Sequence, residues 1–412
     1  MAIRCNERKA CDKVRLLHGV LKKMQHVPGA PTPPKDQIAP LTSLRFFAAF
    51  FVVIYHLQGN VIPMGSMNQL ALGVSFFFVL SGFILSTVYP DTSKISLPKF
   101  YVSRLARLWP VHALCFAVVV YLYDPGMLTN EFWQPKLLTN LLMLHAWIPQ
   151  AGYVFSLNSV SWSISVELGF YLIFPVLAAS KRLGTVFVIA GILVMIMIFQ
   201  LEFNDATASS DDPWKFSAIL LVAQSPFTRV FEFIVGMWAA RIYREKRFFG
   251  FVKANANPLE VASIFLLLAY CIASRHIVAN ILAEGFQAFG NWFDVAGGVF
   301  CFAILIFVFA HSAGVLSKFL SHRILLFLGE SSFTLYMVHQ IIIKYAEIQG
   351  WTKLLSWPKT LLLICAAIAI TTVVVHVLWE RPMRWLIVNG YAALANRMSV
   401  IKRLMVSEGP HA

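Results

Sequence analysis

Residues 41–60, LTSLRFFAAFFVVIYHLQGN, form an apolar run that nevertheless carries Arg45 and His56. In a single α-helix, the eleven steps between these two residues would separate them by roughly 16 Å along the axis. Eleven steps of about 100° also return to almost the same helix face, so the cation and the imidazole would point the same way. The length and apolarity of the run are typical of a membrane-spanning helix.

Ionisable side chains inside a membrane usually face a cavity or a partner, which makes this stretch a candidate functional site. The alternative is that Arg45 extends to the lipid headgroups and that His56 hydrogen-bonds to a neighbouring helix. Arg45 alone fits both explanations. Two ionisable groups on one face favour the functional one.

The composition is that of a membrane protein with many spans. Of the 412 residues, 58% are hydrophobic and 13% are charged, and the mean hydropathy is +0.69. These values lie outside the range of soluble domains. Repeated apolar runs of about 18 or more residues predict an all-α integral membrane protein. The six cysteines show no disulfide or zinc-binding pattern, so we expect reduced thiols and no metal.

The chain divides into a basic tail and linker (1–40), a transmembrane domain (41–388) and a second basic tail (389–412). Residues 137–147 are apolar but short, and we interpret them as a re-entrant or interfacial helix. Ten spans are predicted, at residues 41–60, 70–89, 108–123, 162–179, 185–201, 216–240, 259–273, 292–311, 324–345 and 359–379.

The distribution of the net charge of +14 predicts the orientation of the chain. With ten spans, most Lys and Arg residues fall on one side, so the positive-inside rule predicts both termini in the cytoplasm and a location in the plasma (inner) membrane. The placement of Lys and Arg in cytoplasmic loops explains the positive net charge, so we do not expect a nucleic-acid partner. An eleventh crossing at 137–147 would place Lys181, Arg182 and the basic cluster at Arg241 outside. No internal repeat is obvious, which weakens a transporter interpretation.

Arg104 and Arg107 form a second polar feature, at the predicted start of the third span. A spacing of three places both guanidinium groups on one helix face, where each can bind phosphate oxygens in a bidentate way. The expected helix N-terminus would add a favourable dipole for anions. The alternative is ordinary anchoring by positive charges on the cytoplasmic side.

Glu167 is a carboxylate inside the fourth span, roughly 8 Å beyond its start by helical rise. Such a group needs a cationic partner or a shifted pKa, and it suits proton transfer or the orientation of an imidazole. By contrast, Arg229 and Glu232 in the sixth span are best explained as a structural ion pair.

Three further polar residues lie in the last two spans, namely Tyr336, His339 and His376. Buried Tyr and His most often make hydrogen bonds between helices. We consider a catalytic role possible for His339 and do not expect one for His376.

Together these features predict phosphate-binding arginines at the inner surface and acid–base chemistry further out. Acyl-coenzyme A suits such a site, because its phosphate-rich head carries a long pantetheine arm. The hypothesis is acyl transfer across the membrane.

Seven segments carry a resemblance that runs nearly from end to end of the membrane part. They are LTSLRFFAAFFVVIYH, GVSFFFVLSGFILS, FYVSRLARLWPVH, SWSISVELGFYLIFP, PFTRVFEFIVGMWAA, FLGESSFTLYMVHQ and HVLWERPMRW. In this order they resemble the type-three acyltransferase family of integral membrane O-acyltransferases. That family includes acetylases of lipopolysaccharide O-antigen, exopolysaccharide and other glycans. The family often has acidic residues at the positions of Thr42 and Ser75, and a Ser-Tyr pair where this chain has Ser332 and Phe333.

The resemblance implies O-acyl transfer, most often of acetyl, from acyl-CoA to a hydroxyl of a cell-surface glycan. His56 would be the general base, or would be acylated transiently, and Glu167 would orient it. Arg104 and Arg107 would bind the phosphates of CoA, with Arg45 as a third cation. Supporting roles are expected at Trp162, Ser163, Ser165, Tyr336 and His339.

Three alternatives remain open at this point. The acceptor could be a lipid or a small molecule such as a macrolide, with the same residues at work. The protein could instead be a transporter or flippase of glycan intermediates, which would need no CoA site. A regulatory membrane protein without activity is disfavoured, because His56, Glu167 and both arginines are present.

Overall fold

The computed structural model describes residues 38–59, 61–63, 67–123, 125–203 and 212–407. The predicted N-terminal basic tail and linker (1–40), apart from their last three residues, lie outside this range. The described residues are almost entirely helical, and their only β feature is an isolated bridge between Gln58 and Ile62. The prediction of an all-α protein is confirmed.

Ten helical spans in the described part of the chain are long and apolar enough to cross a membrane, as predicted. Helices interrupted by a turn count as one span. The spans are formed by α2 (Ala39–Leu57), η1 and α3 (Asn68–Leu72, Gly73–Val88), α4 (Leu97–Tyr123), η5 and α7 (Ser159–Ser161, Trp162–Ala179), α8 (Leu183–Phe203), α9 and α10 (Ala218–Gln224, Pro226–Arg244), α12 (Ala256–Ala283), α13 and α14 (Gln287–Ala296, Val299–Ala310), α16 (Arg323–Ile348), and α18, η6 and α19 (Trp357–Val375, His376–Glu380, Arg381–Ser407).

Short helices connect the spans. Residues 137–147 do not form a crossing helix, in line with the prediction, because α5 ends at Leu141 and the left-handed Met143 turns the chain. The connecting helices are η2 (Thr92–Lys94), η3 (Pro125–Leu128), α5 (Gln134–Leu141), η4 (His145–Trp147), α6 (Ala151–Val154), α11 (Phe249–Ala254), α15 (Val315–Leu320) and α17 (Trp351–Leu354).

Helix α4 corrects one prediction, because it begins at Leu97 rather than near residue 108. Pro98 is favourable in the first turn of a helix, and Phe100 is buried, with its ring stacked on that of Phe174. Arg104 and Arg107 therefore lie within the helix, about two and three turns from its start. The expected contribution of a helix N-terminus to anion binding at these residues is wrong, since the dipole effect is confined to the first turn.

Glycine contacts set the packing of the central helices. A Cβ at Gly82 of α3 would lie 2.0 Å from the carbonyl oxygen of Phe233 in α10, and one at Gly236 would lie 2.0 Å from that of Val79. A Cβ at Gly329 of α16 would likewise lie 2.0 Å from the carbonyl oxygen of Thr42 in α2. Small residues allow this close approach of backbones between membrane helices. Two tight pairs result, α3 with α10 and α2 with α16.

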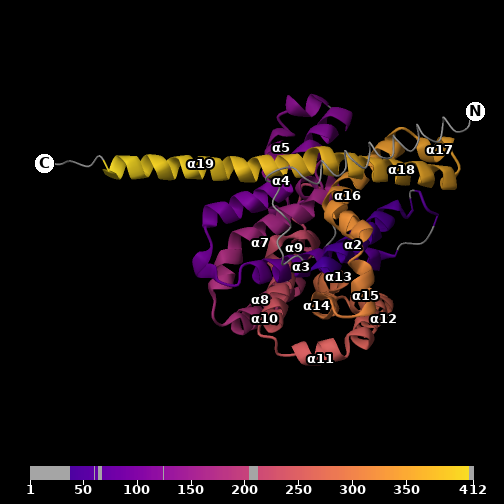
Figure 1. Ribbon diagram of the computed structural model, residues 1–412. Coiled ribbons are helices and arrows are strands. Elements are labelled where there is room, and N and C mark those ends of the chain that lie inside the picture. The colour runs from indigo at the N-terminus through magenta and orange to yellow at the C-terminus, as the bar shows by residue number, and fades with distance from the viewer. Residues whose placement is uncertain (1–37, 60, 64–66, 124, 204–211, 408–412) are drawn as a thin grey trace, which may run out of the picture. The chain divides into compact units, whose positions relative to one another are not determined.

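The last span continues without a break into a long helix. Figure 1 shows α18 and α19 as one run beside α4, which α19 contacts. A π-helical turn, His376–Glu380, joins them, and it directs His376 and Glu380 into the protein interior. The expected end of the span near Trp379 is therefore not an end of the helix.

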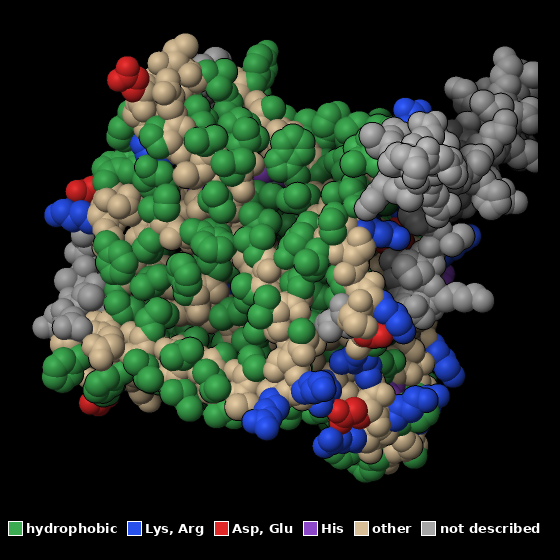
Figure 2. Space-filling model, turned by 90° about the vertical axis from the view of Figure 1, so that its left-hand side faces the viewer, with side chains coloured by type: hydrophobic (Ala, Val, Ile, Leu, Met, Phe, Trp, Pro, Cys, Tyr) green, Lys and Arg blue, Asp and Glu red, His purple; other side chains and the backbone are tan. Residues whose placement is uncertain are grey.

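The surface between the helix ends is apolar. Figure 2 shows a broad face covered by hydrophobic side chains, with Lys and Arg gathered toward its lower right edge. Phe199 and Phe203 of α8 and Phe265 and Ile272 of α12 are more than half exposed. Exposed apolar surface of this extent is typical of contact with lipid.

Candidate active site

His56 is held in the last turn of α2, at the end opposite Arg45. Its Nδ1 lies 2.9 Å from the carbonyl oxygen of Val52 and 3.1 Å from Nε2 of His339 in α16. With Nδ1–H donated to Val52, the lone pair of the ring lies on Nε2. No hydrogen bond joins this Nε2 to any described residue, so it is available to a substrate. His56 lies one residue before the end of α2, because the helix ends at Leu57 and not near residue 60 as predicted.

A row of polar side chains extends from His56 across α16 to α7. The rings of His339 and Tyr336 lie 5.8 Å apart between centroids. The Tyr336 hydroxyl donates to the carbonyl oxygen of Val160 over 2.9 Å and accepts from Ser163 Oγ over 2.8 Å. His339, Tyr336 and Ser163 are all buried. The structure thus joins three of the predicted supporting residues to His56.

The predicted arginines gather at the other end of α2. The charge of Arg107 acts on Arg45, and those of Arg104 and Arg107 act on Arg384 of α19. The guanidinium of Arg104 lies 5.9 Å from the ring centroid of Tyr171, a distance typical of a cation–π contact. The buried Nε of Arg45 has no hydrogen-bond partner. We call Arg45, Arg104, Arg107 and Arg384 the arginine cluster.

Glu167 belongs to the arginine cluster rather than to His56. Its Oε1 accepts hydrogen bonds from Ser81 Oγ over 3.2 Å and from the Tyr171 hydroxyl. Its charge acts on both Arg45 and Arg107. Within the described ranges, no hydrogen bond joins Glu167 to His56. The geometry gives Glu167 the cationic neighbours that a membrane carboxylate needs.

A second carboxylate, Glu380, faces the same cluster from the π-helical turn. Its Oε2 accepts from Thr334 Oγ1 over 2.5 Å and lies 2.6 Å from His376 Nδ1. The charge of Glu380 acts on Arg45 and Arg107 as well. Four arginines thus face two carboxylates, which leaves a surplus of positive charge for an anionic ligand.

Two predicted supporting residues lie elsewhere. Ser165 Oγ accepts from the backbone N–H of Ala146 over 3.2 Å, and its carbonyl oxygen accepts from the Trp147 indole over 3.2 Å. Ser165 therefore fixes the segment that follows α5. Trp162 lies 5.8 Å from the guanidinium of Arg229, measured to the ring centroid. Neither residue contacts His56 or the arginine cluster among the described interactions.

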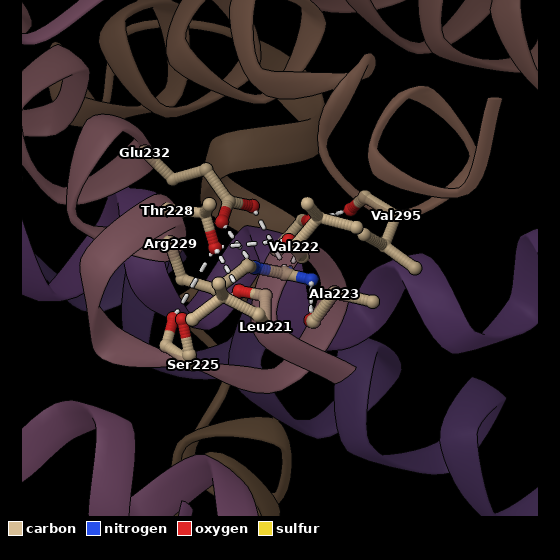
Figure 3. Close-up of polar contacts among 9 residues, drawn as sticks. Leu221, Val222, Ala223, Ser225, Thr228, Arg229, Glu232 and Val295 are labelled. Carbon is tan, nitrogen blue, oxygen red and sulfur yellow. Dashed lines mark hydrogen bonds and ion pairs between the residues drawn. The ribbon is translucent and has the colours of Figure 1, made fainter. Parts of the chain in front are cut away.

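Arg229 forms the ion pair with Glu232 that the sequence predicted (Figure 3). Nε lies 2.5 Å from Glu232 Oε2, and Nη2 lies 3.1 Å from Oε1. Nη1 donates to the carbonyl oxygen of Ala223 over 2.9 Å, and Nη2 donates to Ser75 Oγ over 3.0 Å. Ser75 is a position where the resembling family often has an acid, and here it contacts a guanidinium that Glu232 already neutralises. The prediction of a structural ion pair is confirmed.

A second imidazole pair lies between α4 and the short helix η4. The rings of His112 and His145 are nearly parallel, with centroids 6.3 Å apart. His145 Nε2 lies 3.1 Å from Ser161 Oγ, and His112 Nε2 lies 2.7 Å from the carbonyl oxygen of Asn140. Burial and the neighbouring His112 lower the pKa of His145 to about 3, so its ring is neutral near pH 7.

Comparison with known proteins identifies the family. A family model described as "Acyltransferase domain" matches residues 39–379. The chain belongs to this acyltransferase family. It is therefore an acyltransferase of the membrane, and the alternative of a transporter without acyl-transfer chemistry is disfavoured. No solved structure matches the chain.

Curated relatives of this acyltransferase are similar at low identity. "Acyltransferase MdmB" of Streptomyces mycarofaciens is 28% identical over 336 residues, which cover 76% of this chain and 81% of MdmB. "Putative peptidoglycan O-acetyltransferase YrhL" of Bacillus subtilis (strain 168) is 25% identical over 88% of this chain. "Putative O-acetyltransferase SACOL0978" of Staphylococcus aureus (strain COL) is 25% identical over 79%. The matches cover 57% and 52% of the last two, so this chain spans about half their length.

Sequence reasoning did not assign a role to four residues of this candidate site, namely Ser81, Tyr171, Glu380 and Arg384. Glu380 and Arg384 lie in the segment HVLWERPMRW, where four charged residues follow an apolar run. That density of charge could have indicated them. Ser81 and Tyr171 lie in segments that carry the family resemblance, but they are uncharged and lie in apolar helices, so their polarity alone did not indicate a role at the site.

Proposed function

We propose that this acyltransferase moves an acetyl group from acetyl-CoA to a hydroxyl of a cell-surface glycan in the plasma membrane. The observation that carries the proposal is that α2 has the arginine cluster at one end and an available imidazole nitrogen at the other. The orientation predicted from charge places the cluster on the cytoplasmic side, where acyl-CoA is made. Roughly 16 Å of helix separates Arg45 from His56, a distance that suits an extended pantetheine arm.

The arginine cluster would bind the phosphates of CoA. Arginine binds phosphate in a bidentate way and remains charged at all physiological pH values. Arg45 has an unpaired buried Nε, and Arg384 is exposed, so the cluster has free donors and an open side. Glu167 and Tyr171 would hold the arginines in position between substrates. In this proposal Glu167 is a positioning residue for the donor site.

The chemistry would take place at His56. Nε2 of His56 would accept the proton of the acceptor hydroxyl as its oxygen attacks the thioester carbonyl carbon. The C–S bond then breaks, and the CoA thiolate takes the proton from the imidazolium to leave as the thiol. His339 would hold the ring through Nδ1, so that Nε2 faces the reacting atoms.

The name of YrhL supports a glycan acceptor, and the names of YrhL and SACOL0978 support an O-acetyl product. A lipid or small-molecule hydroxyl could be served by the same residues, and acceptor assays distinguish these classes. In each case the donor site and His56 keep their roles.

Donor binding tests the proposal directly. The full chain in nanodiscs is titrated with acetyl-CoA carrying a labelled acetyl group. Wild type should bind, and the double variant Arg104→Ala/Arg107→Ala should bind at least tenfold more weakly, because hydrogen bonds to charged groups contribute about 1.5–3 kcal/mol each. His56→Ala should bind normally and transfer acetyl about 10²–10⁴-fold more slowly.

The matched control is Arg241→Ala/Arg247→Ala. It removes two arginines on the same predicted side, which form exposed ion pairs with Glu245. Exposed pairs contribute little to stability, so this variant should bind like wild type. Equal weakening in both double variants would indicate only the loss of net charge, and unchanged binding in the first would refute the donor site.

A further inference from the structure

A large apolar groove lies on the side of α2 away from the Arg45–His56 face. Its volume is about 980 Å³, at the upper end of the range for small-molecule pockets. In Figure 1, α14 and α15 lie next to α2, which they contact, and α12 lies beside α14 and α15. Residues of α2, α3, α12, α14, α15 and η1 line the groove. Neither His56 nor the arginine cluster lines it. It is therefore a separate site.

The groove follows α2 along its length. Leu44, next to Arg45, lines one end together with Leu320 of α15. Met67 and Gln69 line the other end, near the end of α2 that carries His56. Between them the walls are almost entirely aliphatic and aromatic, and exposed residues such as Phe51 and Leu268 leave the groove open to the bilayer. This geometry suits one long hydrocarbon chain.

The end near Met67 differs from the rest because it carries polar side chains. Arg275 and His276 of α12 line the groove there, and both are exposed. No described residue forms an ion pair with Arg275. A cation at the mouth of an apolar groove between membrane helices is suited to a lipid phosphate.

This end is also connected to the catalytic helix. The backbone N–H of Met67 donates to Gln58 Oε1 over 2.7 Å, and Gln58 follows His56 by two residues. A head group held at Arg275 would therefore lie on the same side of the membrane as His56, beside the segment that ends α2.

We propose that the groove binds the hydrocarbon tail of a lipid phosphate that carries the acceptor sugar, with Arg275 holding the phosphate. This rests on the proposed function, because it specifies how the glycan acceptor reaches His56. The tail occupies the groove along α2 and α12, and the sugar extends toward Nε2 of His56. The acceptor is thus delivered from within the bilayer.

Native mass spectrometry of the full chain, with polyprenyl monophosphate as the probe, tests the groove. Leu268→Trp fills the groove from α12 and should abolish binding. The matched control Phe265→Trp changes the same helix at a residue that is 65% exposed and outside the groove, and it should bind like wild type. Equal binding by both variants would overturn the proposal.

The head-group contact is tested with Arg275→Gln and its control Lys359→Gln, an exposed cation elsewhere. Arg275→Gln should weaken binding of polyprenyl phosphate about tenfold or more, and Lys359→Gln should not. Wild type should prefer the phosphate to polyprenyl alcohol. Equal affinity for the alcohol would refute the role of Arg275, and equal affinity for phosphatidylglycerol would show that an ordinary phospholipid occupies the groove.

Acetyl-CoA binding, measured on the same samples, separates this inference from the proposed function. It should be unchanged in Leu268→Trp and Arg275→Gln, because the arginine cluster lies on the other side of α2. Loss of lipid binding with retained acetyl-CoA binding would be the expected result for these variants. A wild type that binds acetyl-CoA but no polyprenyl phosphate would refute the groove alone.

Discussion

Arg229 and the arginine cluster differ in how their donors are used. Arg229 is 1% exposed, and its donors bind Glu232, Ser75 and the carbonyl oxygen of Ala223. Arg45 is partly buried, has an unpaired Nε and lies near other arginines. A buried cation whose nitrogens all have partners, one of them a carboxylate, stabilises a fold, whereas a cation with an unpaired nitrogen in a cluster of surplus positive charge is placed for a ligand.

Substitution of Glu232 is the strongest test of the difference between Arg229 and the arginine cluster. Glu232→Ala leaves Arg229 buried without its counter-charge, which typically costs about 3–5 kcal/mol. We expect a large fall in the thermal unfolding temperature of the protein in detergent. The double variant Arg229→Met/Glu232→Leu should recover most of the loss, since it removes both charges at similar volume.

Arg45→Met is the matched test in the arginine cluster. It removes one of four cations that face two carboxylates, and the remaining arginines still neutralise both, so stability should stay close to that of wild type while acetyl-CoA binding falls. If Arg45→Met destabilised the protein as much as Glu232→Ala, Arg45 would be a structural residue, and the distinction between the two groups would fail.

The catalytic end of α2 gives the largest expected effect on rate. His56→Ala removes the general base, and such groups contribute about 10²–10⁴-fold. The rate of acetyl transfer from acetyl-CoA should fall by that amount, with an unchanged unfolding temperature. His322→Ala, an exposed histidine at the start of α16, is the control and should keep full activity. A fully active His56→Ala would refute the assignment.

The sequence alone was enough to predict the positions of the spans and the presence of Arg45 and His56 on one helix. Apolar runs and basic loops are local patterns, so all ten spans were predicted near their observed positions. The start of α4 was missed because Arg104 and Arg107 make its first turns polar, and hydropathy does not detect a helix that extends beyond the apolar run.

The arrangement of the site was less predictable, because contacts between helices depend on packing. Glu167 was expected to orient His56, and the structure instead places it with Tyr171 and the arginines. Nothing local to SWSISVELG shows which helix α7 faces. The contact of His339 with His56 likewise depends on the close approach of α16 to α2 at Gly329.

His145 is a third kind of buried polar group, because it is neutral. Its effect on stability can be measured as a function of pH. Its pKa falls from 6.5 to about 3 on burial, so the unfolded chain binds the proton first as pH falls. The contribution of His145 to the free energy of unfolding is fully present above pH 6.5 and is lost as the pH falls toward 3. Between pH 7 and 5 the loss should be about 2 kcal/mol, at 1.36 kcal/mol per pKa unit.

His145→Gln should flatten this part of the stability profile, measured by thermal unfolding in detergent at a series of pH values. His322→Gln, which changes an exposed histidine, should leave the slope as it is in wild type. An unchanged slope in His145→Gln would mean that other groups produce the acid sensitivity.

The smallest expected effect is that of His339 on kcat, and its size distinguishes a residue that positions His56 from one that transfers a proton. His339 contacts Nδ1 of His56 and not the nitrogen that would face the substrate. A neutral hydrogen bond contributes about 0.5–1.5 kcal/mol, so His339→Gln should lower kcat only a few-fold to about tenfold. KM for acetyl-CoA should stay unchanged, because the arginine cluster lies at the other end of α2. A loss of kcat as large as that of His56→Ala would instead make His339 a second acid–base group, and the two imidazoles would then share the proton.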